Sequence, residues 1–232
     1  MADYIAEYTR YLTEERHSSA NTIASYVRDV TQFVGYLRET ECVEILDCRQ
    51  EHIDHYVVYM SSKGKSASSI ARCIASLKSF YGFLMDSGVV NSNPARNITP
   101  VRAERKFPQI LTGKEVELFL EQPECVDAKG YRDHAMLELL YATGIRVSEL
   151  INLDVDDLNL SAGFLRCSSR GKERIIPLYA GAVKALGDYV KNIRPQIVFE
   201  PDEAALFVNM NGERMSRQGF WKIIKYYQEK AE

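Results

Sequence analysis

Residues 131–178 read YRDHAMLELLYATGIRVSELINLDVDDLNLSAGFLRCSSRGKERIIPL. From about Arg132 to Tyr141 the stretch is strongly apolar and predicts a helix, which Gly144 is placed to end. After a further short helix, LDVDDLNL, FLRCSS and ERIIPL predict three strands in an antiparallel meander. Two helices followed by a small sheet indicate a mostly helical domain of the α+β class.

The segments around this stretch are predicted to be helical as well. In LTGKEVELFL, Thr112 precedes Glu115 by three residues, which is the spacing of a capping box. Helix returns at about 180–193, and Ser216 is placed to cap a last helix. That helix reaches Glu232 without a Gly, Asn or Pro to stop it, so we expect more chain to belong here.

The N-terminal part of the chain predicts a module of four helices and shows no strand pattern. The helices are expected at about 2–15, from Ser18 or Ser19 onwards, at about 49–61, and from Ser66 to Gly88.

A polar and basic segment separates the two parts. It covers 97–108 and contains Pro100 and Pro108, as a linker would. The predicted organisation is therefore a helical domain at 1–96, a linker at 97–108 and a second domain at 109–232.

The composition excludes several classes of protein. The chain has 232 residues, of which 46% are hydrophobic and 26% charged, so it can bury cores of its own. No run approaches the ~18 apolar residues of a membrane span, and the N-terminus carries acids and tyrosines in place of a signal peptide. Five scattered cysteines without a CxxC pair argue against a zinc ribbon or a disulfide scaffold. We expect a cytoplasmic protein with reduced thiols, no membrane partner, no metal and no cofactor.

The charge of the chain is unevenly distributed. The net charge of −3 excludes a wholly basic nucleic-acid binder. Three local stretches are nevertheless basic: Lys63, Lys65, Arg72 and Lys78; Arg102, Arg105 and Lys106; and Arg166, Arg170, Lys172 and Arg174. Such stretches are compatible with a DNA-binding surface and equally with ordinary solvated faces.

The segment ATGIRVSEL, residues 142–150, carries the strongest candidate for a functional site. Arg146 falls in the first turn of a predicted helix, where the macrodipole favours acids rather than a cation. The position suits an anion that docks at the helix start, bound by the guanidinium and by backbone amides. Glu149, three residues on, is placed to hold Arg146. The same spacing also fits an ordinary surface ion pair worth a few tenths of a kcal/mol.

Residues 131–178 closely resemble the catalytic domain of tyrosine recombinases, the family of Xer-type recombinases and phage integrases, with TGIRVSEL and KERIIPL as specific motifs. The N-terminal half resembles the family's core-binding domain through SANTIASYVRDVTQFVGYL, SIARCIASLKSFYGFL and NPARNI. The resemblance implies a mainly α fold of the α+β class. It would combine a helical core-binding (SAM-like) bundle with a mostly helical catalytic domain that holds a small three-stranded antiparallel sheet. In the family, the arginine at the position of Arg146 holds the scissile phosphate and the acid at Glu149 supports it.

The resemblance leaves the lysine of the β-hairpin open. Family members commonly carry GKGNKER, and the first lysine acts as general acid toward the leaving 5′ oxygen. Counting back from Pro177 places Ser169 at that position, so Lys172 is the nearest candidate and Arg170 the substitute cation. Alternatively, Lys172 corresponds to the family's second, structural lysine.

The family reaction needs groups that these 232 residues do not show. It is a phosphoryl transfer without metal, in which a tyrosine forms a 3′-phosphotyrosyl link and a second arginine, from an HxxR motif, stabilises the transition state. None of the four histidines is followed by an arginine three residues later. Tyr226 and Tyr227 continue an apolar stripe, and we expect them to be packing or surface residues rather than the nucleophile. We therefore expect a chain that lacks the end of its active site, as a shortened product rather than a naturally truncated gene.

The resemblance also implies a partner, the double-stranded DNA of a recombination site. The family's two domains clamp the duplex, with helices of the N-terminal domain in the major groove. Here these helices start at Ser66 and near Asn21. The candidates for DNA contacts on these helices are Lys65, Arg72, Lys78 and, more weakly, Arg28, each of which also fits a solvated helix face. Arg170 of the hairpin is a further candidate for DNA binding.

The predicted function is thus site-specific DNA recombination or integration by strand cleavage and rejoining, with these 232 residues binding DNA without turnover. Family recombinases assemble as tetramers on paired sites, whereas we expect a monomer for this chain in solution. The alternatives are a naturally truncated, non-catalytic DNA-binding relative and a helical interaction protein with no DNA role.

Overall fold

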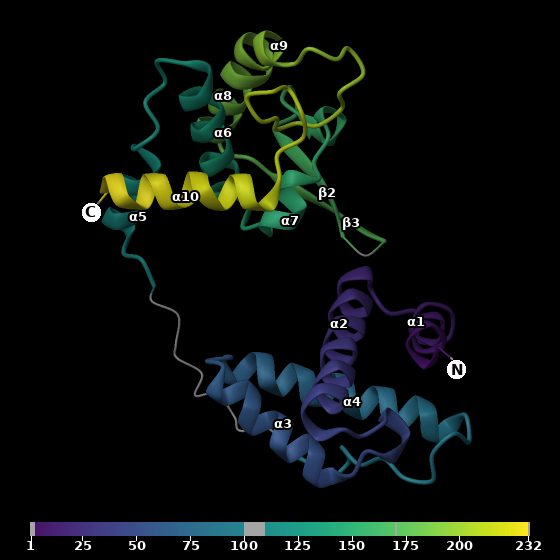
Figure 1. The fold of residues 1–232 in the computed structure, drawn as a ribbon. Coiled ribbons are helices and arrows are strands. Elements are labelled where there is room, and N and C mark those ends of the chain that lie inside the picture. Colours follow the sequence, from purple (N-terminus) through teal and green to yellow (C-terminus); the bar gives the residue numbers. More distant parts are fainter. Residues whose placement is uncertain (1–2, 100–109, 170, 232) are drawn as a thin grey trace. The chain divides into compact units, whose positions relative to one another are not determined.

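The computed structural model describes residues 3–99, 110–169 and 171–231, and the chain folds as two compact units that divide between residues 107 and 108. Figure 1 follows the elements of both units along the chain. The predicted linker lies mostly outside the described residues, including its basic residues Arg102, Arg105 and Lys106. Arg170 also lies outside them.

The first unit is a helical bundle, as the sequence predicts. Its α-helices are α1 (Tyr4–Glu14), α2 (Ala20–Tyr36), α3 (Gln50–Ser62) and α4 (Ala67–Asp86), with a π-helical turn at Leu37–Glu41 and a 3₁₀ turn at Ile45–Asp47 between α2 and α3. Ser19 and Ser66 begin α2 and α4 as predicted. The Ser19 Oγ accepts the N–H of Thr22 at 3.3 Å, and the Ser66 Oγ accepts that of Ser69 at 3.2 Å. A serine cap of this kind stabilises a helix by about 1 kcal/mol.

The apolar stripes of these helices meet in one core. Tyr8 of α1, Phe33 of α2, Ile53 of α3 and Phe80 of α4 are fully buried in it. The rings of Tyr8 and Phe80 pack edge to face, with their centroids 5.2 Å apart. Burial of each large apolar side chain contributes about 1.5–3 kcal/mol. The core therefore fixes α4 against α2.

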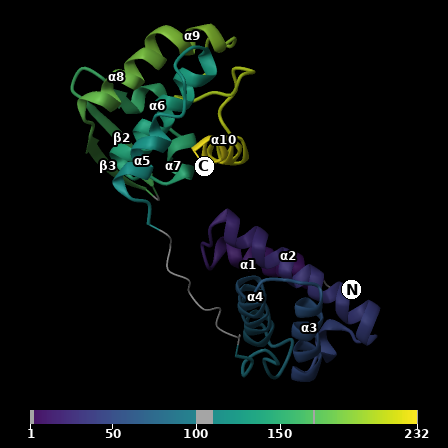
Figure 2. The same ribbon diagram turned by 90° about the vertical axis from the view of Figure 1, so that its left-hand side faces the viewer.

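The second unit is mostly helical and holds a small sheet. Its helices are α5 (Gly113–Leu120), α6 (Ala128–Thr143), α7 (Val147–Ile151), α8 (Ala180–Asp188), α9 (Arg194–Ile197) and α10 (Arg217–Ala231), with a 3₁₀ turn at Val155–Asp157 and a π-helical turn at Tyr189–Ile193. Helix α10 packs against α5 and α7, and Figure 2 shows it nearly end-on. The helix predicted at 180–193 thus corresponds to α8 and the π-helical turn, and α9 continues it to Ile197.

The three predicted strands form an antiparallel sheet in the order β1 (Leu158–Asn159), β2 (Phe164–Ser169) and β3 (Lys172–Pro177). In the register of β2 and β3, Cys167 lies opposite Arg174 and Ser169 lies opposite Lys172. Gly171, with φ +74°, allows the tight connection between the strands. Figure 1 shows this hairpin extending away from the helices of its unit.

Helix α6 begins earlier than the apolar pattern predicts. The Asp127 Oδ1 accepts the N–H of Gly130 at 2.6 Å and caps the helix at Ala128. A Cβ at Gly130 would lie 1.8 Å from the carbonyl oxygen of Glu124, so the close approach of this loop requires glycine. The first turn contains Lys129 and Gly130 in place of large apolar residues, so the apolar spacing does not mark the helix start.

A buried polar cluster ties α6 to α10. Arg132 Nη2 donates to Asp133 Oδ1 at 2.7 Å, and Arg132 Nη1 donates to the carbonyl oxygen of Val208 at 3.2 Å. The hydroxyl of Tyr227 donates to Asp133 Oδ2 at 3.1 Å. Burial raises the pKa of Asp133, while the neighbouring guanidinium of Arg132 opposes that shift. The cluster satisfies its own charges within the unit.

Candidate phosphate-binding site

The turn between α6 and α7 places Arg146. Helix α6 ends at Thr143, and Gly144 adopts the left-handed conformation with φ +60°, its N–H bound to the carbonyl oxygen of Leu140 at 2.8 Å. Glycine adopts this conformation without the steric cost of a Cβ. Arg146 follows as the N-cap residue of α7, and 74% of its side chain is exposed to solvent.

Glu149 holds Arg146 mainly through the backbone. Its Oε2 accepts the main-chain N–H of Arg146 at 2.7 Å, whereas Arg146 Nη1 reaches Oε1 only at 3.5 Å. The carboxylate is itself buried, with 5% of its side chain exposed. The Arg146 guanidinium therefore lies over a buried anchor and presents most of its surface to solvent.

A second arginine, Arg174 of β3, completes the arrangement. Its Nη2 donates to Glu149 Oε2 at 3.0 Å, and 47% of its side chain is exposed. The sequence shows Arg174 as part of a basic stretch but does not predict this contact, because the two residues are 25 apart. The alternation along β3 is the signal that could have found it, since Arg174 and Ile176 share a face of the sheet.

These contacts also set the ionisation of Glu149. The backbone hydrogen bond from Arg146 lowers the pKa of the Glu149 carboxyl, and the positive charges of Arg174 and Arg146 lower it further, against the effect of burial. In the described part of the chain, two arginines lie within 4 Å of this one carboxylate, so the three side chains together carry a net positive charge. A cluster of this charge can bind an anion such as a phosphate.

Lys172 lies at the start of β3 and is exposed. It is directly opposite position 169, where the resemblance expects a lysine. Lys172 also shares its face with Arg174, two residues on, about 7 Å along the strand. The fold thus places Lys172 on the same side of the hairpin as the Arg174 contact.

Tyr226 and Tyr227 both contact other side chains of the second unit. Tyr227 is buried and donates its hydroxyl to Asp133, and burial raises its pKa well above the usual range. Tyr226 is 46% exposed, and the Lys129 ammonium lies 4.5 Å from the centre of its ring. Tyr227 thus packs inside its unit and Tyr226 lies at the surface.

In the first unit, Arg72 forms an ion pair with an acid of α2. Its Nε and Nη2 each donate to a carboxylate oxygen of Asp29 at 2.9 Å, and the Ser76 hydroxyl donates to the same carboxylate. Asp29 is only 3% exposed, so Arg72 is the cationic partner of a buried acid, while 43% of the Arg72 side chain itself stays exposed. The bidentate contact gives Arg72 a structural role that the sequence does not reveal.

The other candidates for DNA contacts are placed differently. Lys65 and Arg28 are exposed, the former just before the Ser66 cap and the latter on α2. Lys78 is partly buried, and its carbonyl oxygen accepts the side-chain N–H of Asn93 at 2.9 Å. Six residues separate it from Arg72, which turns it about 120° around α4. The candidates therefore do not all share one face, and their roles in DNA binding stay predictions.

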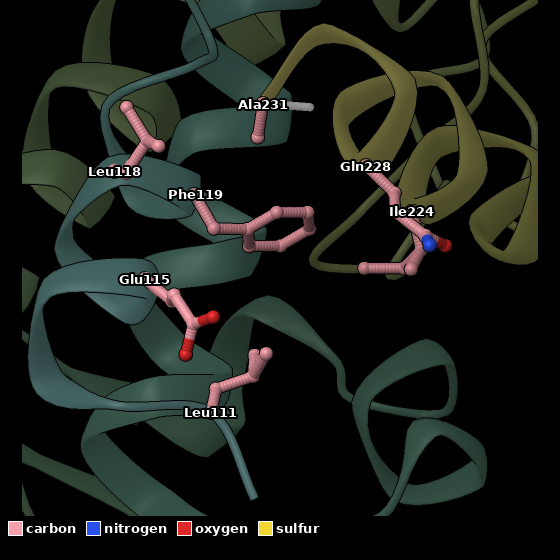
Figure 3. A pocket seen from close by; sticks show the side chains of 7 residues that line it. All are labelled: Leu111, Glu115, Leu118, Phe119, Ile224, Gln228 and Ala231. Carbon is pink, nitrogen blue, oxygen red and sulfur yellow. The ribbon is translucent and has the colours of Figure 1, made fainter. Parts of the chain in front are cut away.

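An open pocket of about 480 Å³ lies between α5 and α10. Figure 3 shows its mostly apolar lining, with the Phe119 ring directed toward Ile224. Its acid, Glu115, is used in the predicted capping box, since Oε2 accepts the N–H of Thr112 at 2.6 Å. None of the predicted site residues lines it.

Two further structural findings concern the described residues. They contain no group of three or more His, Cys, Asp or Glu side chains arranged to hold a metal ion. Within the same ranges, no helix combines the length and the apolar character needed to span a bilayer.

Comparisons with known proteins agree with this architecture. Residues 109–232 match the family model described as Phage integrase family, and residues 5–88 match that of Phage integrase, N-terminal SAM-like domain. The chain therefore belongs to the phage integrase family, the tyrosine recombinases. The predicted fold class, a helical SAM-like domain with a mostly helical catalytic domain and a small antiparallel sheet, is confirmed.

The chain is similar in sequence to several curated recombinases. It is 40% identical to a Tyrosine recombinase XerD of Staphylococcus epidermidis, with all of this chain and 79% of that protein covered. It is 38% identical to a Putative tyrosine recombinase of Caldanaerobacter subterraneus, with 97% of this chain and 76% of that protein covered.

Two solved structures share the fold at low sequence identity. One is a lambda integrase dimer bound to a COC′ core site, with a TM-score of 0.75, 16% identity, and coverage of 100% of this chain and 78% of that one. The other is the Tn1549 transposon integrase in complex with circular intermediate DNA, with a TM-score of 0.74, 21% identity, and coverage of 98% and 79%.

Proposed function

We propose that this chain acts in site-specific DNA recombination by binding the duplex of a recombination site and contacting a backbone phosphate through Arg146. The observation that carries the proposal is the exposed guanidinium of Arg146 above a buried carboxylate that Arg174 also contacts. A guanidinium can bind a phosphate with two parallel hydrogen bonds. The family supplies the reaction, in which the phosphate is the scissile one.

The related structures support DNA as the partner. The lambda integrase dimer is bound to a core site, and the Tn1549 integrase is in complex with circular intermediate DNA. A lambda integrase tetramer is bound to a Holliday junction, which supports assembly of several copies on DNA. For this chain without DNA we expect a monomer in solution; a stable tetramer in light scattering would contradict that expectation.

In the proposed reaction, strand cleavage forms a 3′-phosphotyrosyl intermediate and releases a 5′ hydroxyl. Arg146 would stabilise the negative charge of the transition state, and Lys172 would donate a proton to the leaving 5′ oxygen from the hairpin. Arg170 remains the substitute cation. The chain shows no HxxR motif, and Tyr227 is buried against Asp133. We therefore expect these 232 residues to bind DNA without turnover.

Two assays test the proposal. In the first, a labelled duplex is selected from a randomised library by the chain itself, and its binding is measured. If no duplex of the library binds the chain, the proposal is contradicted and an interaction protein without a DNA role is favoured.

In the second, a nicked suicide duplex traps any covalent protein–DNA adduct. We expect none from these residues, as for a non-cutting DNA-binding relative. An adduct on Tyr226 or Tyr227 would overturn the assignment of those tyrosines to packing.

A further inference from the structure

We propose that Arg174 is a positioning residue for Arg146, on which it acts by holding and neutralising Glu149. The inference rests on the proposed contact between Arg146 and a DNA phosphate. Among the described residues, Glu149 is the group that Arg146 and Arg174 contact in common.

The Glu149 carboxylate is held by Arg146 and Arg174 together. A single oxygen, Glu149 Oε2, accepts both the main-chain N–H of Arg146 at 2.7 Å and the Nη2–H of Arg174 at 3.0 Å. A carboxylate fixed from two directions cannot rotate away from the Arg146 amide. Arg174 therefore helps to keep the backbone of Arg146 in its N-cap position.

The negative charge of Glu149 is compensated mainly by Arg174. A buried carboxylate needs a cationic partner, and the Arg146 guanidinium, 3.5 Å away and 74% exposed, contacts Glu149 only weakly. Arg174 supplies the closer contact. Without Arg174, the guanidinium of Arg146 would be drawn toward Glu149 and would be less available to an external anion.

Arg174 is itself held in place by the sheet. Its backbone lies opposite Cys167, which is 1% exposed, and the β2–β3 ladder fixes the pair. Lys172 is two residues away on the same face. The contact between Arg174 and Glu149 therefore also sets where the hairpin lies relative to Arg146.

A double-mutant cycle on the full chain tests the proposal with the selected duplex. Arg146→Ala is made in the wild-type and in the Arg174→Gln backgrounds. In the wild-type background we expect R146A to weaken binding about tenfold, as for the loss of a charged hydrogen bond. In the R174Q background the same change should cost less than about threefold, because Arg146 is already displaced.

The controls separate positioning from folding. Arg166→Gln removes an exposed arginine from the opposite face of the same hairpin. In this background R146A should weaken duplex binding as much as it does in the wild type. Arg174→Lys keeps the charge and one donor. In this background R146A should therefore weaken binding nearly as much as in the wild type. The amide resonance of Arg146 should move in R174Q and not in R166Q, which a general weakening of the hairpin would not produce.

The outcomes are distinct. If R146A costs as much in R174Q as in the wild type, the positioning role is wrong, while the proposed function stands. If R146A has no effect in the wild type, the proposed function itself fails. Should R174Q not fold, the cycle is run on Arg174→Met, which keeps the aliphatic part of the side chain but removes the charge. There, a cost of R146A below the wild-type value supports the proposal, and an unchanged cost overturns it.

Discussion

Glu149 binds Arg146 by its backbone more closely than by its side chain. The main-chain N–H of Arg146 lies 2.7 Å from Glu149 Oε2, whereas the guanidinium reaches Oε1 at 3.5 Å. An ordinary surface ion pair, the alternative that this spacing allows, would expose both partners. Here the carboxylate is 5% exposed and the guanidinium 74% exposed. The pair is therefore asymmetric, with a buried anchor and an available cation.

Glu149→Gln should change the response of the protein to acid. Glutamine keeps an acceptor for the Arg146 N–H but loses the charge, so we expect a loss of about 1–2 kcal/mol in the free energy of unfolding at neutral pH. Because the pKa of Glu149 is lowered on folding, its stabilising effect is present above about pH 4.5 and is lost as the pH falls through the lowered value. Urea unfolding across this range should show the gap between wild type and E149Q closing in acid. Parallel curves would contradict the assignment.

Lys172→Ala should weaken DNA binding without affecting the fold. The side chain is exposed at the hairpin, so the free energy of unfolding should change by less than about 0.5 kcal/mol. If Lys172 contacts a phosphate, the salt dependence of binding should fall by about 0.9 in slope. The matched control is Lys191→Ala, an exposed lysine of the same unit. Equal effects of the two substitutions would show a general influence of charge and no contact.

Arg72→Ala should destabilise the first unit, whether or not Arg72 touches DNA. It leaves Asp29 buried with only the Ser76 hydroxyl among the side-chain partners described above. Stranding a buried carboxylate in this way should cost about 2–4 kcal/mol. Thermal or urea unfolding measures this loss, and Arg28→Ala on α2 should be nearly neutral. A stable Arg72→Ala protein would mean that the contact with Asp29 matters little.

The DNA contact predicted for α4 is better tested with Lys65, which precedes the helix, than with Arg72. Lys65→Ala removes an exposed charge beside the Ser66 cap and should leave the stability unchanged. Its loss of affinity therefore reports contact directly, and adding Arg72→Ala at a temperature where the protein is folded should flatten the salt slope further. An unchanged slope in the double variant would contradict both contacts.

Tyr227→Phe should cost about 1 kcal/mol in stability, because it removes one hydrogen bond to the buried carboxylate of Asp133. DNA binding at a temperature well below the unfolding transition should be unchanged. The control is Tyr226→Phe, whose side chain is half exposed and for which no such loss is expected. Reduced DNA binding by a fully folded Y227F variant would point to a functional role for this hydroxyl.

The elements that the sequence predicts well are those determined by neighbouring residues. The caps at Ser19, Ser66 and Thr112 each use a hydrogen bond that spans three residues, and Gly144 ends its helix by its own conformation. Such features depend on short patterns that can be read directly from the chain. The two-domain organisation is likewise predicted from a local pattern, the polar segment with Pro100 and Pro108.

The electrostatic connections could not be predicted in the same way. Arg174 and Glu149 are 25 residues apart, and Arg72 and Asp29 are 43 apart, so their contacts depend on packing between elements. The charge pattern shows these arginines as basic residues but not as partners of buried acids. Their structural roles emerge only when the strand register and the α2–α4 packing are known.

The contact between Arg146 and a DNA phosphate is tested most directly by the salt dependence of duplex binding. The affinities of the wild-type chain and of Arg146→Ala for the selected duplex are measured over a range of salt concentrations, with Arg166→Ala as the control. We expect the slope of log affinity against log salt to fall by about 0.9 in Arg146→Ala and by less in the control. An unchanged slope and affinity in a folded Arg146→Ala protein would contradict it.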